Sequence, residues 1–149
     1  MLMRRPPILS RNLLFALFIA TSAVFAANPA GSHVKLAGHS FSVEIARTEA
    51  ARDRGLMYRT HLTSDHGMLF IYHDAQLRYF WMKHTLIPLD ILFFDAQRRL
   101  INVSADTPPC KTDSCQTYAS AAPAKYVLEL KAGVAEKLGI KADDRFTIR

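Results

Sequence analysis

From about residue 30 onward, apolar and polar residues alternate in short runs. The clearest run places Phe41, Val43 and Ile45 on one side of an extended chain, with Ser42 and Glu44 on the other. A period of two residues predicts a strand with one buried face. Comparable runs predict seven further strands, over residues 34–36, 68–72, 79–83, 89–94, 100–103, 126–130 and 146–148. The polar or small residues between the fifth and sixth of the eight strands, 95–99, are expected to form a hairpin connection.

Two segments carry helix signals. Thr48 can cap a helix whose first turn contains Glu49, and this helix should end near residues 55–57. A second helix is predicted over residues 133–138, with Gly139 in the left-handed conformation after it. Eight short strands and two short helices predict a mainly β fold of the α+β class, arranged as a small barrel-like antiparallel structure.

The first 26 residues do not share this pattern. Arg4, Arg5 and Arg11 lead into an apolar run over residues 13–19, which is too short to span a membrane and is followed by small residues up to Ala26. We interpret this segment as a signal peptide that is cleaved after Ala26; an uncleaved N-terminal anchor is the alternative. The mature protein is then expected to be periplasmic or secreted, without stable membrane insertion.

Residues 27–149 are expected to form a single domain with one hydrophobic core. The leader removes three arginines and no acidic residue, which leaves 16 Lys and Arg against 13 Asp and Glu, a net charge of +3. These charges are spread along the chain, whereas a nucleic-acid-binding surface needs a clustered basic face. The sequence therefore predicts no nucleic-acid partner.

Cys110 and Cys115 are the two cysteines, and they lie in a segment rich in Pro, Ala, Ser and Thr. An exported protein meets an oxidising compartment, which favours a disulfide between them. A thioredoxin-type redox centre would place two residues between its cysteines, and here there are four. We interpret the pair as a structural disulfide.

The densest aromatic cluster lies in the predicted strand 79–83. If Phe80 and Met82 face inward, then Tyr79, Trp81 and Lys83 share the outer face, because consecutive strand residues point to opposite sides. An aromatic surface beside a cation can stack a sugar ring or hold a peptide. The alternative is that a helix or loop covers Trp81 and makes a second packed layer. The expected ligand-binding set is Trp81, Lys83, Arg54, Tyr79 and Asp90.

Asp90 is the single charge between Leu86 and Phe94. Because a buried carboxylate must be paired, hydrogen-bonded or protonated, it is a candidate acid or base that would act with Lys83 or His84. The other interpretation is a structural carboxylate tied to Lys83, to Arg54 or to backbone amides.

Metal and cofactor signals are weak. Thioether sulfurs of Met57, Met68 and Met82, with His84 or His66, could bind Cu(I), but methionine also fills gaps in apolar cores. The histidines lack the spacing of a zinc hydrolase, and the chain contains no dinucleotide fingerprint, P-loop or Gly-x-Ser-x-Gly elbow. We expect no cofactor.

Four short motifs occur together in this chain: Gly55-Leu56-Met57, Gly67-Met68-Leu69-Phe70, Phe80-Trp81-Met82-Lys83 and Ile87-Pro88-Leu89-Asp90. In this order and spacing they resemble the family called domain of unknown function 192, and residues 115–118, 126–130 and Gly133 extend the likeness to about residues 41–145. The resemblance implies a β-rich barrel class, and the family name assigns no reaction. His84 stands where the family usually has Asn, and residues 141–144 lack the usual glycine before the aspartate.

The sequence therefore predicts an exported β-rich module that binds a small polar ligand, a glycan or a partner protein through the face of Trp81 and Lys83. One alternative is a cell-envelope hydrolase or lyase that uses Asp90 with Lys83 or His84 as an acid–base pair. A periplasmic Cu(I)-binding protein is the other.

Overall fold

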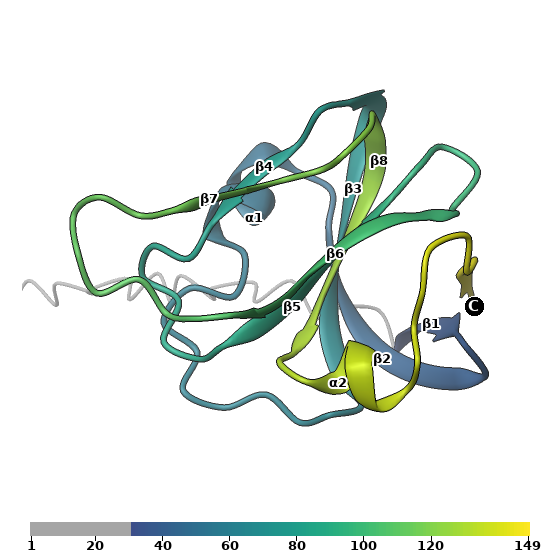
Figure 1. Cartoon of the computed structure of the whole chain (residues 1–149), viewed down its shortest axis with the longest axis horizontal. Coiled ribbons are helices and arrows are strands. Elements are labelled where there is room, and N and C mark those ends of the chain that lie inside the picture. Colours follow the sequence, from purple (N-terminus) through teal and green to yellow (C-terminus); the bar gives the residue numbers. More distant parts are fainter. Residues whose placement is uncertain (1–30) are drawn as a thin grey trace, which may run out of the picture.

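The computed structural model describes residues 31–149, so the predicted signal peptide and its cleavage site lie outside the described residues. Figure 1 shows a strongly twisted sheet with short helices at its margins. The elements are β1 (Ser32–Leu36), β2 (His39–Ala46), α1 (Glu49–Arg54), β3 (His66–Gln76), β4 (Tyr79–Trp81), β5 (Leu89–Phe94), β6 (Leu100–Thr107), β7 (Thr117–Ala119), β8 (Ala124–Lys131), α2 (Val134–Lys137) and β9 (Thr147–Ile148). Neither helix of this part of the chain is long and apolar enough to cross a membrane.

The mainly β, α+β class is confirmed, and all eight predicted strands are present. Thr48 caps α1 by accepting a hydrogen bond from the Ala51 amide, α1 ends at Arg54 with Gly55 as its C-cap, and Gly139 follows α2 with a φ of 63°. The hairpin of β5 and β6 is also as expected.

The prediction of a barrel-like antiparallel arrangement is wrong in two respects. The main sheet has the order β6-β5-β8-β3-β2-β1-β9 and is not closed, and its β2 and β3 strands are parallel. Parallel neighbours need a crossover connection. The segment between β2 and β3 is such a crossover and contains α1, so the strand–helix–strand pattern around Thr48 produces a mixed sheet.

A separate two-stranded sheet pairs β4 with β7, and the sequence did not predict β7. β7 is only three residues long and follows the Cys110–Cys115 disulfide, which is present as predicted. Cys110 also donates its backbone N–H to the Met82 carbonyl, 3.3 Å away. The disulfide loop is therefore held at two points: Cys110 pairs with Lys83, and β7 pairs with β4 beside Trp81.

Two apolar layers cover the two faces of the main sheet. β5 is buried along its whole length, with Ile91 and Phe93 in one layer and Leu92 and Phe94 in the other. The first layer is covered by residues of α1, β4 and β7, and the second by α2 and Phe146. In Figure 1, β4 and β7 lie together beside α1, away from α2 and the C-terminus.

Gly67 is required where β3 lies against β8. A Cβ atom at this position would come within 2.4 Å of the Glu129 carbonyl oxygen and 2.8 Å of a Leu130 methyl group. Backbone atoms cannot yield as a flexible side chain can, so the first glycine of the Gly67–Phe70 motif sets the close spacing of β3 and β8.

Asp90 is fully buried and holds the sheet to α2. One carboxylate oxygen accepts the backbone N–H groups of Asp106 (2.9 Å) and Gly133 (3.2 Å), and the other accepts that of Ala135 (2.8 Å). The N-cap of α2 is Gly133, which has no side chain to cap the helix, so the Asp90 carboxylate supplies the acceptor from a neighbouring strand.

We expect Asp90→Asn to lower the free energy of unfolding by about 2–4 kcal/mol, because an amide NH₂ group would replace one of the acceptor oxygens and face a buried N–H donor. Urea unfolding measures this loss. Asp113→Asn, at an exposed position in the disulfide loop, is the control and should stay within about 0.5 kcal/mol of wild type. An Asp90→Asn protein as stable as the control would contradict the role given to Asp90.

Candidate functional site

The alternation predicted for residues 79–83 is confirmed. Phe80 and Met82 pack into the apolar layer beneath β4, whereas Tyr79 and Trp81 are 64% and 54% exposed. The Lys83 ammonium lies 5.5 Å from the centroid of the Trp81 ring. Trp81 is thus an open platform, and the alternative in which a helix or loop seals it is not what the structure has.

A cleft of about 420 Å³ lies beside this platform, between α1, the end of β3 and β4. Its size falls within the range of roughly 300–1,000 Å³ that is usual for small-molecule sites. Tyr79 and Trp81 provide its aromatic residues at β4, while Arg52, Asp53 and Arg78 are among the charged groups that line it. We call it the outer cleft.

One wall of the outer cleft is a stack of two guanidinium groups on Tyr72. The Arg78 and Arg52 guanidinium carbons lie 3.7 Å and 4.9 Å from the centre of the Tyr72 ring. Arg78 also donates to the Ala124 carbonyl (3.1 Å) and to an Asp74 carboxylate oxygen (2.6 Å). Burial raises the pKa of Tyr72 above its usual 10.0. These contacts hold the wall in one conformation before any ligand arrives.

A smaller cavity of about 40 Å³ adjoins the outer cleft and shares Arg52, Asp53, Phe80 and Trp81 with it. We call it the inner pit. The last turn of α1 contributes Arg54 to its lining, and further groups come from the segment before β5 and from β8. A space of this size has room for a water molecule or one small polar group of a ligand.

Glu129 of β8 lines the inner pit and is a candidate site residue that was not singled out from the sequence. It is paired in register with Met68 of β3 on one side and Ile91 of β5 on the other, and it is only 5% exposed. Its Oε2 atom is buried and has no hydrogen-bond partner within residues 31–149. Burial raises the pKa of Glu129 from 4.5 to about 8, so the carboxyl group is mostly neutral near pH 7.

An unpaired buried polar atom is rare in folded proteins and needs an explanation. A signal for Glu129 was present in the sequence, because it is the single charge in the apolar run 126–130. The same signal marked Asp90. The sequence alone could not show that Asp90 meets three backbone donors while Glu129 meets none.

Asp90 does not line the outer cleft or the inner pit, and neither does Lys83, so the expected ligand-binding set is not brought together in one concavity with Trp81. Ile91 faces the layer beneath β4, and Asp90 therefore points to the opposite face of the sheet, toward α2. Its hydrogen bonds go to backbone amides and not to Lys83, Arg54 or His84. The proposed acid–base pair of Asp90 with Lys83 or His84 is not assembled.

The remaining predicted site residues, His84 and the three methionines, are found in three different surroundings. The His84 ring stacks on Tyr58, with 5.3 Å between the ring centres. Met68 and Met82 are buried in the layer beneath β4, where the Thr107 hydroxyl contacts the Met82 sulfur at 3.5 Å, and Met57 lines the inner pit. Within residues 31–149, no group of three or more His, Cys, Asp or Glu side chains could hold a metal ion.

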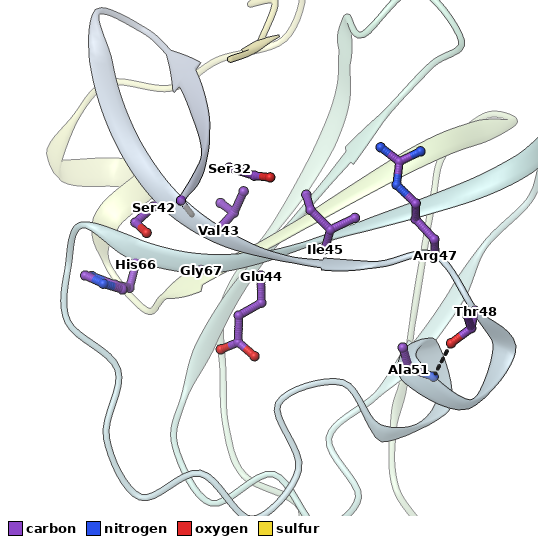
Figure 2. A pocket seen from close by; sticks show the side chains of 11 residues that line it. Ser32, Ser42, Val43, Glu44, Ile45, Arg47, Thr48, Ala51, His66 and Gly67 are labelled. Carbon is purple, nitrogen blue, oxygen red and sulfur yellow. Dashed lines mark hydrogen bonds between the residues drawn. The ribbon is translucent and has the colours of Figure 1, made fainter. Parts of the chain in front are cut away.

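A second large pocket, of about 440 Å³, lies along β2 and the start of β3 (Figure 2). Three of its polar side chains, those of Glu44, Thr48 and His66, already have partners. The Glu44 carboxylate accepts two hydrogen bonds from Arg59 (2.6 and 2.7 Å), His66 contacts Asp65 at 2.9 Å, and Thr48 caps α1. The two large pockets have nearly equal volumes, so the unpaired Glu129 carboxyl decides in favour of the inner pit and outer cleft as the candidate site.

We expect Glu129→Gln to stabilise the protein at alkaline pH and to leave it almost unchanged at pH 4. The folded state keeps a proton on Glu129 that the unfolded chain releases as the pH rises through 4.5, so wild-type stability falls by up to about 1.4 kcal/mol per pH unit until about pH 8. The amide does not titrate and removes this loss. Urea unfolding of both proteins from pH 4 to pH 9 measures the difference, and parallel stability curves would contradict the buried, neutral carboxyl group.

Two solved structures are similar to this chain, and neither is described by a reaction. A protein of unknown function from Novosphingobium aromaticivorans DSM 12444 is 38% identical, with a TM-score of 0.72 over 77% of this chain and 83% of that chain. A "putative transcription regulator" from Sinorhizobium meliloti 1021 is 35% identical, with a TM-score of 0.73 over 80% of this chain and 94% of that one. No curated protein matches the chain.

The family resemblance found in the motifs is confirmed over nearly all of the described residues. Gly55, Gly67, Trp81 and Glu129, which shape or line the candidate site, all lie within the matched segment. Since the family model described as "Uncharacterized ACR" matches residues 32–148, the chain belongs to the DUF192 family.

Proposed function

We propose that this domain is a binding module for a small polar ligand, which lies on Trp81 in the outer cleft and places one polar group in the inner pit. The observation that carries the proposal is the carboxyl group of Glu129: the residue lines the inner pit beside Trp81, and its Oε2 atom is buried without a hydrogen-bond partner in residues 31–149. A ligand group that hydrogen-bonds this carboxyl would supply the partner that the protein leaves out.

The energetics support a functional reason for Glu129. Leaving a buried polar group without a partner costs about 1–3 kcal/mol. The neighbours in register on both sides are apolar, Met68 and Ile91, so an apolar side chain would suit the position better in the unliganded protein. Residues that lower stability in this way are typical of functional sites.

A binding function is favoured over the alternative in which Asp90 performs acid–base catalysis. The catalytic alternative needed Asp90 beside Lys83 or His84, and its carboxylate is occupied on the other face of the sheet. Trp81, by contrast, is exposed on β4, and the half-buried Lys83, two residues further along the chain, places its ammonium group 5.5 Å from the Trp81 ring centre. The proposed binding module therefore uses Trp81, Tyr79, Lys83 and Arg54 of the expected set, with Glu129 in place of Asp90.

Trp81 is the single tryptophan of the chain, so intrinsic fluorescence reports directly on the candidate site. We expect at least one of three probe classes (neutral oligosaccharides, dipeptides and polyamines) to change Trp81 emission in a saturable way. The same probe should raise the free energy of unfolding by about 2.7 kcal/mol at 100 times its dissociation constant.

Two variants should separate binding from folding. Glu129→Met should lose at least tenfold in affinity while the protein becomes more stable. Trp81→Ala, whose binding is measured by calorimetry, should also lose affinity, and its free energy of unfolding should fall by less than the roughly 3–5 kcal/mol typical of removing a core tryptophan. Glu136→Gln, at an exposed position on α2, is the control. If Glu129→Met bound as tightly as the control, the inner pit would have no part in binding.

We also propose that the protein is exported, with the first 26 residues removed. Support comes from the leader-like sequence and from the disulfide between Cys110 and Cys115, a bond that persists in oxidising compartments. Intact-mass spectrometry of protein from the periplasmic fraction should give a chain that begins at Ala27. Alkylation without reductant should modify neither cysteine. A mass that includes residues 1–26 would instead indicate a membrane-tethered form.

A further inference from the structure

The charged side chains that line the outer cleft and the inner pit indicate what net charge the ligand carries. Apart from His73 and Glu129, the outer cleft and inner pit are lined by three arginines and three acidic side chains: Arg52, Arg54, Arg78, Glu49, Asp53 and Asp74. Arg78 is already paired with Asp74, and Arg52 donates to the Ile71 carbonyl. The Lys83 ammonium lies beside Trp81 but outside this lining, so the charges of the lining itself favour neither an anion nor a cation, and a neutral polar ligand fits it.

The inner pit selects a group that can both donate and accept hydrogen bonds. A neutral carboxyl has one O–H donor and a carbonyl acceptor, and a hydroxyl group matches both. An ammonium group has only donors, so it would leave the O–H of a neutral Glu129 carboxyl without an acceptor. The volume of about 40 Å³ suits a single hydroxyl or hydroxymethyl group.

The platform above the pit has the dimensions of a ring-stacking surface. Tyr79 and Trp81 are both more than half exposed and lie two residues apart on the same face of β4. Two residues of a strand span about 6.6 Å. Aromatic faces of this kind contact the apolar C–H face of a sugar ring and leave the hydroxyl groups at its edge free for the charged side chains of the cleft.

We infer that the ligand is a carbohydrate, whose ring stacks on Trp81 while one hydroxyl group enters the inner pit and hydrogen-bonds the Glu129 carboxyl. This inference rests on the proposed function and narrows its ligand to one chemical class. The neutral hydroxyl group restores the missing partner of Oε2 without bringing a charge into the buried site.

The test uses Trp81 fluorescence and calorimetry with residues 27–149 and with the full-length chain. The probes are the hexasaccharides of N-acetylglucosamine, maltose-type glucose and cellulose-type glucose. At least one should shift Trp81 emission with saturation, and its permethylated form, which cannot donate a hydrogen bond, should bind at least tenfold more weakly.

The variants give the second half of the test. Glu129→Gln should keep the affinity for the oligosaccharide within about threefold, because an amide also donates and accepts, whereas Glu129→Met should lose at least tenfold. An oligosaccharide that binds equally well to Glu129→Met would overturn the placement of a hydroxyl group in the pit.

Other outcomes separate this inference from the proposed function. If dipeptides or spermidine bind in a way that depends on Glu129 and none of the three hexasaccharides does, the ligand is not a carbohydrate but the binding module stands. If no probe of any class changes Trp81 emission or stability, both the inference and the proposed function fail.

Discussion

The antiparallel pairing of β5 with β8 fixes the positions of both buried carboxyl groups and organises the two sides of the main sheet. Both strands lie inside the main sheet, with apolar layers on each face. Their register places Asp90 opposite Leu130 and Ile91 opposite Glu129. Because side chains alternate, the two carboxyl groups of this strand pair point to opposite faces of the sheet. One pairing thus gives the molecule a structural acid on one side and a candidate ligand-binding acid on the other.

The two acids illustrate how a buried carboxyl can be stable or costly in the same sheet. Asp90 accepts three backbone N–H groups and joins β5, the end of β6 and α2. Glu129 lies between Met68 and Ile91, where the neighbouring strands already use their backbone groups in the sheet. Its pKa rises through burial alone, since no donor or cation offsets the loss of water. The candidate site is therefore where the fold gives up stability.

The open form of the sheet creates the space for this site. Since β2 and β3 are parallel, the crossover between them carries α1 over the face that holds Glu129. β4 leaves the main sheet to pair with β7 and brings Trp81 to the same place, while the Cys110–Cys115 disulfide ties the intervening loop to Met82 and Lys83. A closed antiparallel barrel of the same strands would not place α1 and Trp81 around one pit.

Features that depend on near neighbours were predictable from the sequence: eight of the nine strands in residues 31–149, the cap of α1 by Thr48, the alternation of Tyr79, Phe80 and Trp81, and the family. Three features emerged only in the folded domain: the parallel pairing of β2 with β3, the strand β7, and the contrast between Asp90 and Glu129. These depend on partners far away in the chain: Asp90 meets donors 16 to 45 residues away. An isolated charge in an apolar run predicts that a carboxyl group is buried, but whether it finds a donor is set by long-range packing.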